Sequence, residues 1–111
     1  MKTIEWTRDE LIAYVLLYAA NSDFKESNTE RNIIISKVDM QTFQDIHNEF
    51  DHHNDYQSIN KIMTSLKQHA YTSDDVDVLM TDIQTLFFSD GNFNINEQNM
   101  FRCLNRLFKS L

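Results

Sequence analysis

The chain has 111 residues with no proline, one glycine and one cysteine, and its formal net charge is −7 at pH 7. This length fits a single domain over residues 1–111, with one core that buries roughly two-thirds of the unfolded surface. The acidic balance disfavours binding to nucleic-acid phosphates and favours cations and a basic protein partner.

The longest apolar stretch, residues 11–20, is shorter than the ~20 residues that cross a membrane, and charged residues precede it. No membrane span or signal peptide is therefore predicted, and a cytoplasmic location is expected. Cys103 lies in the apolar run MFRCLNRLF. It is interpreted as a small core residue, which is consistent with a reducing compartment.

The near absence of glycine and proline leaves few of the residues that hairpin turns require, so an all-α fold is predicted. Thr7 followed by Glu10 has the form of a capping box and predicts a first helix over about residues 7–21. Further helices are predicted to begin at Ser27 (with Glu30), Asp39, Asn54 or Asp55, Ser73, and Asn94 (with Glu97). The result is a compact bundle of about six helices.

Two of the predicted helix pairs are copies of one internal repeat. Asp23 and Asp90 each follow an apolar helical stretch, and a glutamate that opens another apolar stretch, Glu30 or Glu97, comes seven residues later. Alignment of the aspartates also aligns the apolar positions of the segments 14–35 and 80–101. Hydrophobic periodicity and a fixed acid spacing thus recur together, which predicts two similar helix-loop-helix units.

The second of these loops has only a partial likeness to a calcium EF-hand. Asp90, Asn92 and Asn94 match its ligand positions 1, 3 and 5. Position 6, however, is Ile95, where the loop needs a glycine for its sharp turn. Position 12 is Phe101, where a bidentate glutamate should complete the coordination. An EF-hand is therefore excluded.

The repeat instead resembles the helix-turn-helix unit of the tellurite-resistance TerB-like family, in which Ala-Asp-Gly, an apolar residue and a glutamate follow an apolar helix. The sequence SDGNF of residues 89–93, followed by Glu97, is similar to this pattern. In the first loop Asp23 and Glu30 match, but Phe24 replaces the glycine and Glu26 replaces the apolar residue.

The resemblance implies a helical bundle of pseudo-symmetric halves whose loop acids gather to bind a divalent cation. Its expected ligands are Asp23, Glu30, Asp90 and Glu97. Ca²⁺, Mg²⁺ and Mn²⁺ prefer oxygen ligands of this kind, and Asn92 and Asn94 would be neutral oxygen donors. A second interpretation needs no ion: the two glutamates sit where a capping-box glutamate binds the N-cap N–H, and the aspartates are ordinary turn residues.

A second group of candidate ligands lies in the middle of the chain: His47, Asp51, His52, His53 and Asp55. His47 and Asp51 are four residues apart and would share a helix face, and imidazole with carboxylate suits zinc. The group lacks a recognised zinc frame such as H-E-x-x-H, and histidines are also favoured near a helix end.

The sequence contains no phosphate-binding loop, nucleophile elbow or recognisable acid–base frame, so a non-enzyme is predicted. Two functions remain. One is a small TerB-like domain that binds a divalent cation and acts in stress response or as a scaffold. The other is a structural interaction module whose acidic residues between 39 and 90 bind a basic protein.

Overall fold

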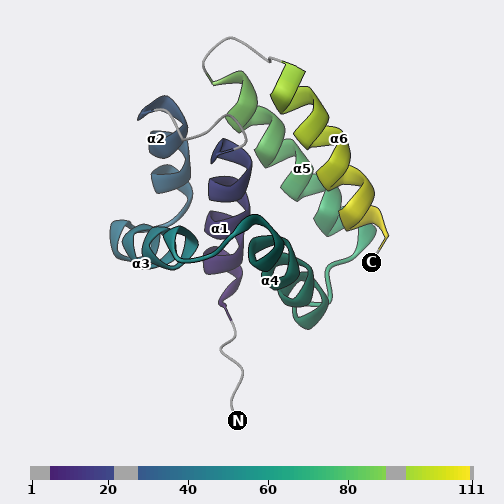
Figure 1. The fold of residues 1–111 in the computed structure, drawn as a ribbon, viewed down its shortest axis with the longest axis horizontal. Helices are drawn as coiled ribbons and strands as arrows, with labels where there is room; N and C mark the ends of the chain where they lie inside the picture. The colour runs from purple at the N-terminus through teal and green to yellow at the C-terminus, as the bar shows by residue number, and fades with distance from the viewer. Residues whose placement is uncertain (1–5, 22–27, 90–94, 111) are drawn as a thin grey trace.

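Six α-helices account for most of the chain in the computed structural model, which describes residues 6–21, 28–89 and 95–110 (Figure 1). The helices are α1 (Arg8–Ala20), α2 (Asn28–Lys37), α3 (Met40–Asp51), α4 (Asp55–Gln68), α5 (Ser73–Phe88) and α6 (Ile95–Lys109). The described residues contain no strand, which confirms the all-α prediction. The Cα radius of gyration, 13.1 Å, matches the value of about 13 Å expected for a compact chain of this length.

Side-chain capping fixes the starts of α1, α3 and α4 at the predicted residues. Thr7 Oγ1 accepts the N–H of Glu10 at 3.1 Å, and Asp39 Oδ1 accepts the N–H of Thr42 at 2.7 Å. Asn54 Oδ1 accepts the corresponding N–H of α4 at 2.8 Å. These bonds satisfy N–H groups that have no partner within their own helix.

The start of α5 is one residue earlier than predicted, because Thr72 and not Ser73 is its N-cap. Thr72 Oγ1 accepts the N–H of Asp75 at 3.2 Å, and Asp75 Oδ2 accepts the N–H of Thr72 at 3.1 Å. Ser73 has Val76 three residues later and cannot form this reciprocal pair. The predicted N-caps Ser27 and Asn94 lie outside the described residues.

Helix α1 is the centre of the bundle and packs against α2, α3, α4, α5 and α6. In Figure 1 it runs between α2 and α3 on one side and the antiparallel pair α5 and α6 on the other. Leu11 and all residues from Ala13 to Ala20 are buried. A helix that is apolar all round in this way is one that its neighbours cover completely.

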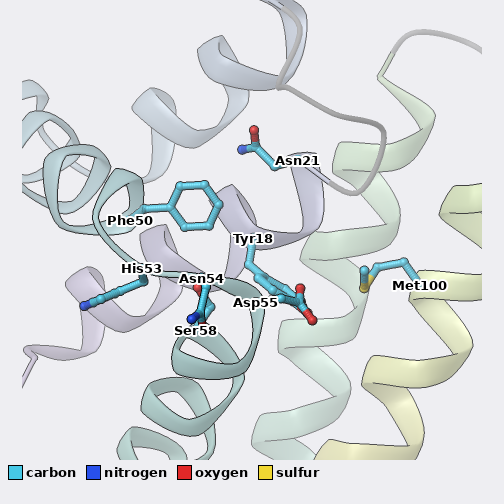
Figure 2. A pocket seen from close by; sticks show the side chains of 8 residues that line it. All are labelled: Tyr18, Asn21, Phe50, His53, Asn54, Asp55, Ser58 and Met100. Atoms are coloured by element: carbon cyan, nitrogen blue, oxygen red, sulfur yellow. Dashed lines mark hydrogen bonds between the residues drawn. The ribbon is translucent and has the colours of Figure 1, made fainter.

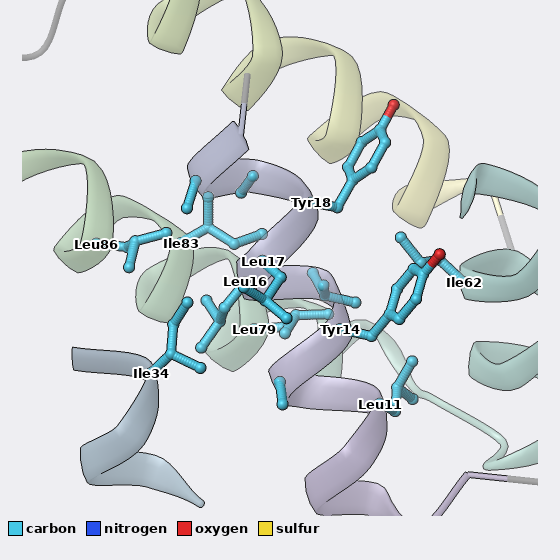
Figure 3. Packing of buried hydrophobic residues seen from close by; sticks show 14 of the residues in the cluster. Leu11, Tyr14, Leu16, Leu17, Tyr18, Ile34, Ile62, Leu79, Ile83 and Leu86 are labelled. Carbon is cyan, nitrogen blue, oxygen red and sulfur yellow. The ribbon is translucent and has the colours of Figure 1, made fainter. Parts of the chain in front are cut away.

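The core gathers around this helix (Figure 3). Leu16 and Leu17 of α1 lie among Ile34 of α2 and the leucines and isoleucine of α5, and Tyr14 points toward α4. Other fully buried side chains are Ile62, Leu66, Leu79, Ile83, Leu86, Phe87 and Phe108.

Trp6 ties the residues before α1 to α3 and α4. Its ring is 5% exposed and stacks on Tyr14 with centroids 4.4 Å apart. Its Nε1–H donates to Glu49 of α3 at 3.0 Å, and Nε2 of His69, at the end of α4, lies 2.7 Å from its carbonyl oxygen. These contacts position the start of α1 against α3 and the C-terminal end of α4.

The link from α4 to α5 is a Schellman motif, with Ala70 in the left-handed region at φ 53°. The N–H of Tyr71 donates to Leu66 O at 3.1 Å and that of Ala70 to Lys67 O at 3.0 Å. Glycine is the usual residue at this position, so this chain accommodates some backbone strain there.

Candidate functional site

Two of the four predicted cation ligands lie within the described residues. Glu30 is the third residue of α2 and Glu97 is the third residue of α6. Their side chains are only 4% and 6% exposed. Asp23 and Asp90, the other two, lie outside the described residues.

The two glutamates differ in burial from the capping-box side chains at the same helical position. Glu10 of α1, Gln57 of α4 and Asp75 of α5 accept their N-cap N–H groups at 2.8, 2.9 and 3.1 Å, and all three bonds are exposed to solvent. Glu30 and Glu97 are buried instead. A charged carboxylate is stable in such a position only with donors or a cation around it.

The helix ends that carry these glutamates lie at one end of the molecule. In Figure 1 the start of α2 and the start of α6 both lie at the top, together with the last turns of α1 and α5. The described helix ends of both predicted repeats therefore lie at this end. The positive ends of the α2 and α6 dipoles face this region and favour the carboxylates that these two helices carry, whereas α1 and α5 bring their negative ends there.

A separate cavity of about 120 Å³ lies where α1, α4 and α6 meet the junction between α3 and α4 (Figure 2). Sequence reasoning missed it, because its walls come from three stretches that are distant in sequence: residues 18–21, residues 50–58 and Met100. The lining residues are Tyr18, Asn21, Phe50, His53, Asn54, Asp55, Ser58 and Met100.

A buried chain of hydrogen bonds lies beside this cavity. The hydroxyl of Tyr14, whose side chain is fully buried, is 2.9 Å from Ser58 Oγ and 2.7 Å from His53 Nδ1. Burial raises the pKa of the Tyr14 phenol, while the bond to Ser58 acts in the opposite direction. Tyr14 therefore remains a neutral hydroxyl that links α1 to the start of α4.

Tyr18 and Asp55 form the charged edge of the cavity. The Tyr18 hydroxyl donates to Asp55 Oδ1 at 2.8 Å. Burial and then the neighbouring Asp55 carboxylate raise the pKa of Tyr18 far above its usual value, because both disfavour a phenolate. Tyr18 is therefore a permanent donor, and Asp55 is the acceptor.

The histidine-rich segment does not form the zinc site that its composition had indicated. His47 Nδ1 contacts Asp51 at 3.2 Å, as the four-residue spacing predicted. His52 contacts a backbone carbonyl, whereas His53 and Asp55 contact the tyrosines of α1. Over residues 6–21, 28–89 and 95–110, no group of three or more His, Cys, Asp or Glu side chains is arranged to hold a metal.

Several acids of α5 are neutralised by cations within the domain. Asp75 pairs with Arg8 at 3.2 Å, Asp77 pairs with Lys109 at 2.7 Å, and Asp82 pairs with Lys37 at 3.2 Å. The N–H and hydroxyl of Thr72 and the Arg8 guanidinium lower the pKa of Asp75, so it stays charged. The net negative charge of this surface is therefore smaller than the number of acidic residues in the sequence implied.

Cys103 is exposed, so the prediction that it is a core residue was wrong. The buried side of α6 is formed by Glu97, Leu104 and Phe108. Cys103 precedes Leu104 by one residue, a rotation of about 100° at 3.6 residues per turn, which turns it away from the core.

No family model, curated protein or solved structure matches this chain. None of the helices in the described part of the chain has the length and apolar character needed to cross a membrane.

Proposed function

We propose that this chain is a non-catalytic, TerB-like helical domain that binds a divalent cation through Asp23, Glu30, Asp90 and Glu97, in a stress-response or scaffold role. The observation that carries the proposal is the burial of both glutamates, at 4% and 6% exposure. The equivalent capping side chains of α1, α4 and α5 are exposed or only partly buried, and their bonds to the N-cap are exposed to solvent. A cation bound among the carboxylates would neutralise the charge that this burial keeps away from water.

The chemistry of the four carboxylates favours Ca²⁺, Mg²⁺ or Mn²⁺, which take oxygen ligands. Carboxylates that approach one another repel unless an ion or protonation neutralises them. The N-terminal ends of α2 and α6 at one end of the bundle support an arrangement in which both repeats contribute (Figure 1). In this arrangement the ion would link the α1–α2 pair to the α5–α6 pair.

Thermal unfolding in the presence of each ion tests the proposal. An ion that binds only the folded state at a hundredfold excess over its Kd adds about 2.7 kcal/mol, which raises Tm by roughly 10 °C in a domain of this size. A chelator should reverse the rise. Asp90→Asn and Glu97→Gln should each lose most of it, while the control Glu10→Gln, in the capping box of α1, should keep it.

The capping interpretation makes the opposite prediction. If Glu30 and Glu97 only cap the N-termini of their helices, one of two results is expected. Either no ion will shift Tm, or the shift will be the same in Asp90→Asn, Glu97→Gln and the wild type. Either outcome would reject the cation site.

The second candidate function is a structural module that binds a basic protein without a metal. Exposed acids that form no ion pair with another described residue favour it, among them Asp45 and Asp74. Such a module would keep its stability and its partner in the presence of a chelator.

A further inference from the structure

The cavity between α1, α4 and α6 has a mixed lining, in which Phe50 and Met100 supply apolar surface and Asp55 supplies one exposed carboxylate. In Figure 2, Tyr18 and Asp55 lie between Phe50 on one side and Met100 on the other. Phe50 and Met100 are partly buried and pack against the core, whereas Asp55 is exposed. A ligand at this position would contact aromatic and thioether surface along its length and the carboxylate at its end.

Asp55 has acceptor capacity that the protein does not use. Oδ1 accepts the Tyr18 hydroxyl at 2.8 Å, and a carboxylate offers about four lone-pair sites. Within residues 6–21, 28–89 and 95–110, Asp55 forms no ion pair with a lysine or arginine, in contrast to Asp75, Asp77 and Asp82. The cavity therefore offers a carboxylate that no lysine or arginine of the described residues pairs with.

The size and the charge of the cavity limit what can enter it. At about 120 Å³ it is smaller than the 300–1,000 Å³ that drug-sized ligands require, so it suits a single side chain. The Asp55 carboxylate and the net charge of −7 repel an anion and attract a cation. A cation near an aromatic face gains a further ~0.5–2 kcal/mol.

Lysine fits these walls better than arginine does. A guanidinium binds best when both oxygens of a carboxylate are available for its planar fork. Here one oxygen, Oδ1, already accepts the Tyr18 hydroxyl. An ammonium group needs only one free oxygen, and its four-carbon chain can lie along Phe50 and Met100.

We propose that this cavity binds the side chain of a lysine presented by a partner protein, with Asp55 pairing the ammonium group and Phe50, Tyr18 and Met100 enclosing its alkyl chain. This site does not involve Asp23, Glu30, Asp90 or Glu97, so it is independent of the proposed cation site. It defines a specific contact that is separate from the internal ion pairs of Asp75, Asp77 and Asp82.

Titration of the ¹⁵N-labelled protein with a blocked Gly-Lys-Gly tripeptide, in the presence of a chelator, tests the proposal. We expect saturable shifts of the amide signals of Asn54, Ser58 and Met100. Asp55→Asn should bind at least 10-fold more weakly, since asparagine keeps an acceptor for Tyr18 but removes the charge. The matched control Asp51→Asn, an exposed acid outside the cavity, should bind as the wild type does.

The comparison of peptides on the wild-type protein does not depend on any variant folding. A tripeptide with norleucine in place of lysine should give no saturable shift. Equal binding of the norleucine peptide, tighter binding of the arginine peptide, absence of saturable shifts with lysine, or undiminished binding in Asp55→Asn would each overturn the proposal.

Discussion

Tyr14 brings a hydroxyl group into the centre of the bundle, and the protein satisfies it with side chains alone. Ser58 Oγ and His53 Nδ1 are its partners, at 2.9 and 2.7 Å, and its ring stacks on Trp6 and meets Phe50 edge-on. A single residue of α1 therefore fixes the start of α4 and holds Trp6 in place. The adjacent cavity depends on this arrangement, because Ser58 and His53 also line it.

Tyr14→Phe should lower the free energy of unfolding by about 1–3 kcal/mol, because buried Ser58 would lose its partner while the packing of the ring is kept. Urea unfolding followed by circular dichroism measures this change. Tyr56→Phe is the control, since Tyr56 is 75% exposed and its replacement should change stability by less than about 0.5 kcal/mol. If Tyr14→Phe lowers the free energy of unfolding no more than Tyr56→Phe does, the Tyr14 hydroxyl contributes nothing to stability.

Residue patterns predicted helix starts well where the cap and its partner are close in sequence. Thr7, Asp39 and Asn54 were recognised because their N-cap bonds span only three residues. The prediction failed at Cys103, because the apolar run around it does not reveal which side of α6 faces the core. The cavity was not predictable for a similar reason: Tyr18, Phe50, Asp55 and Met100 come together only through packing.

At the scale of a single helix, substitutions at the start of α5 test directly which residue is its N-cap. Thr72→Ala should cost about 1 kcal/mol of stability, because the N–H of Asp75 loses its acceptor. Thr72→Ser should restore most of this loss, since serine also caps helices well. Ser73→Ala is the matched control.

If Thr72 alone is the cap, Ser73→Ala will change the free energy of unfolding by less than about 0.5 kcal/mol. Chemical denaturation of the three variants under one set of conditions makes the comparison. A larger loss of stability in Ser73→Ala than in Thr72→Ala would show that Ser73 is the N-cap, as the sequence had predicted.

For the whole molecule, the contacts of α1 with all the other described helices make independent unfolding of one part costly. Leu17 is fully buried, and the helix that carries it packs against both α2 and α5. The α1–α2 and α5–α6 pairs thus share a core and are not separate units.

Leu17→Ala should therefore destabilise the protein by about 2–5 kcal/mol, a large fraction of a typical domain's 5–15 kcal/mol. The fluorescence of Trp6 and circular dichroism should still report the same urea midpoint, as expected for a two-state transition. Val78→Ala, at a position that is 64% exposed, is the control and should cost little. Separate midpoints for the two probes would show that part of the bundle unfolds alone.

The central position of α1 also has a consequence for synthesis on the ribosome. Residues 11–20 carry no charge, and they are made about 60 residues before most of α5, against which they pack. Because synthesis proceeds at roughly 5–20 residues per second, several seconds pass between the synthesis of this apolar segment and that of α5. The side of this segment that α5 later covers thus stays exposed in the nascent chain after α2, α3 and α4 have been made. Molecular chaperones that recognise short apolar stretches have time to bind it before the bundle is complete.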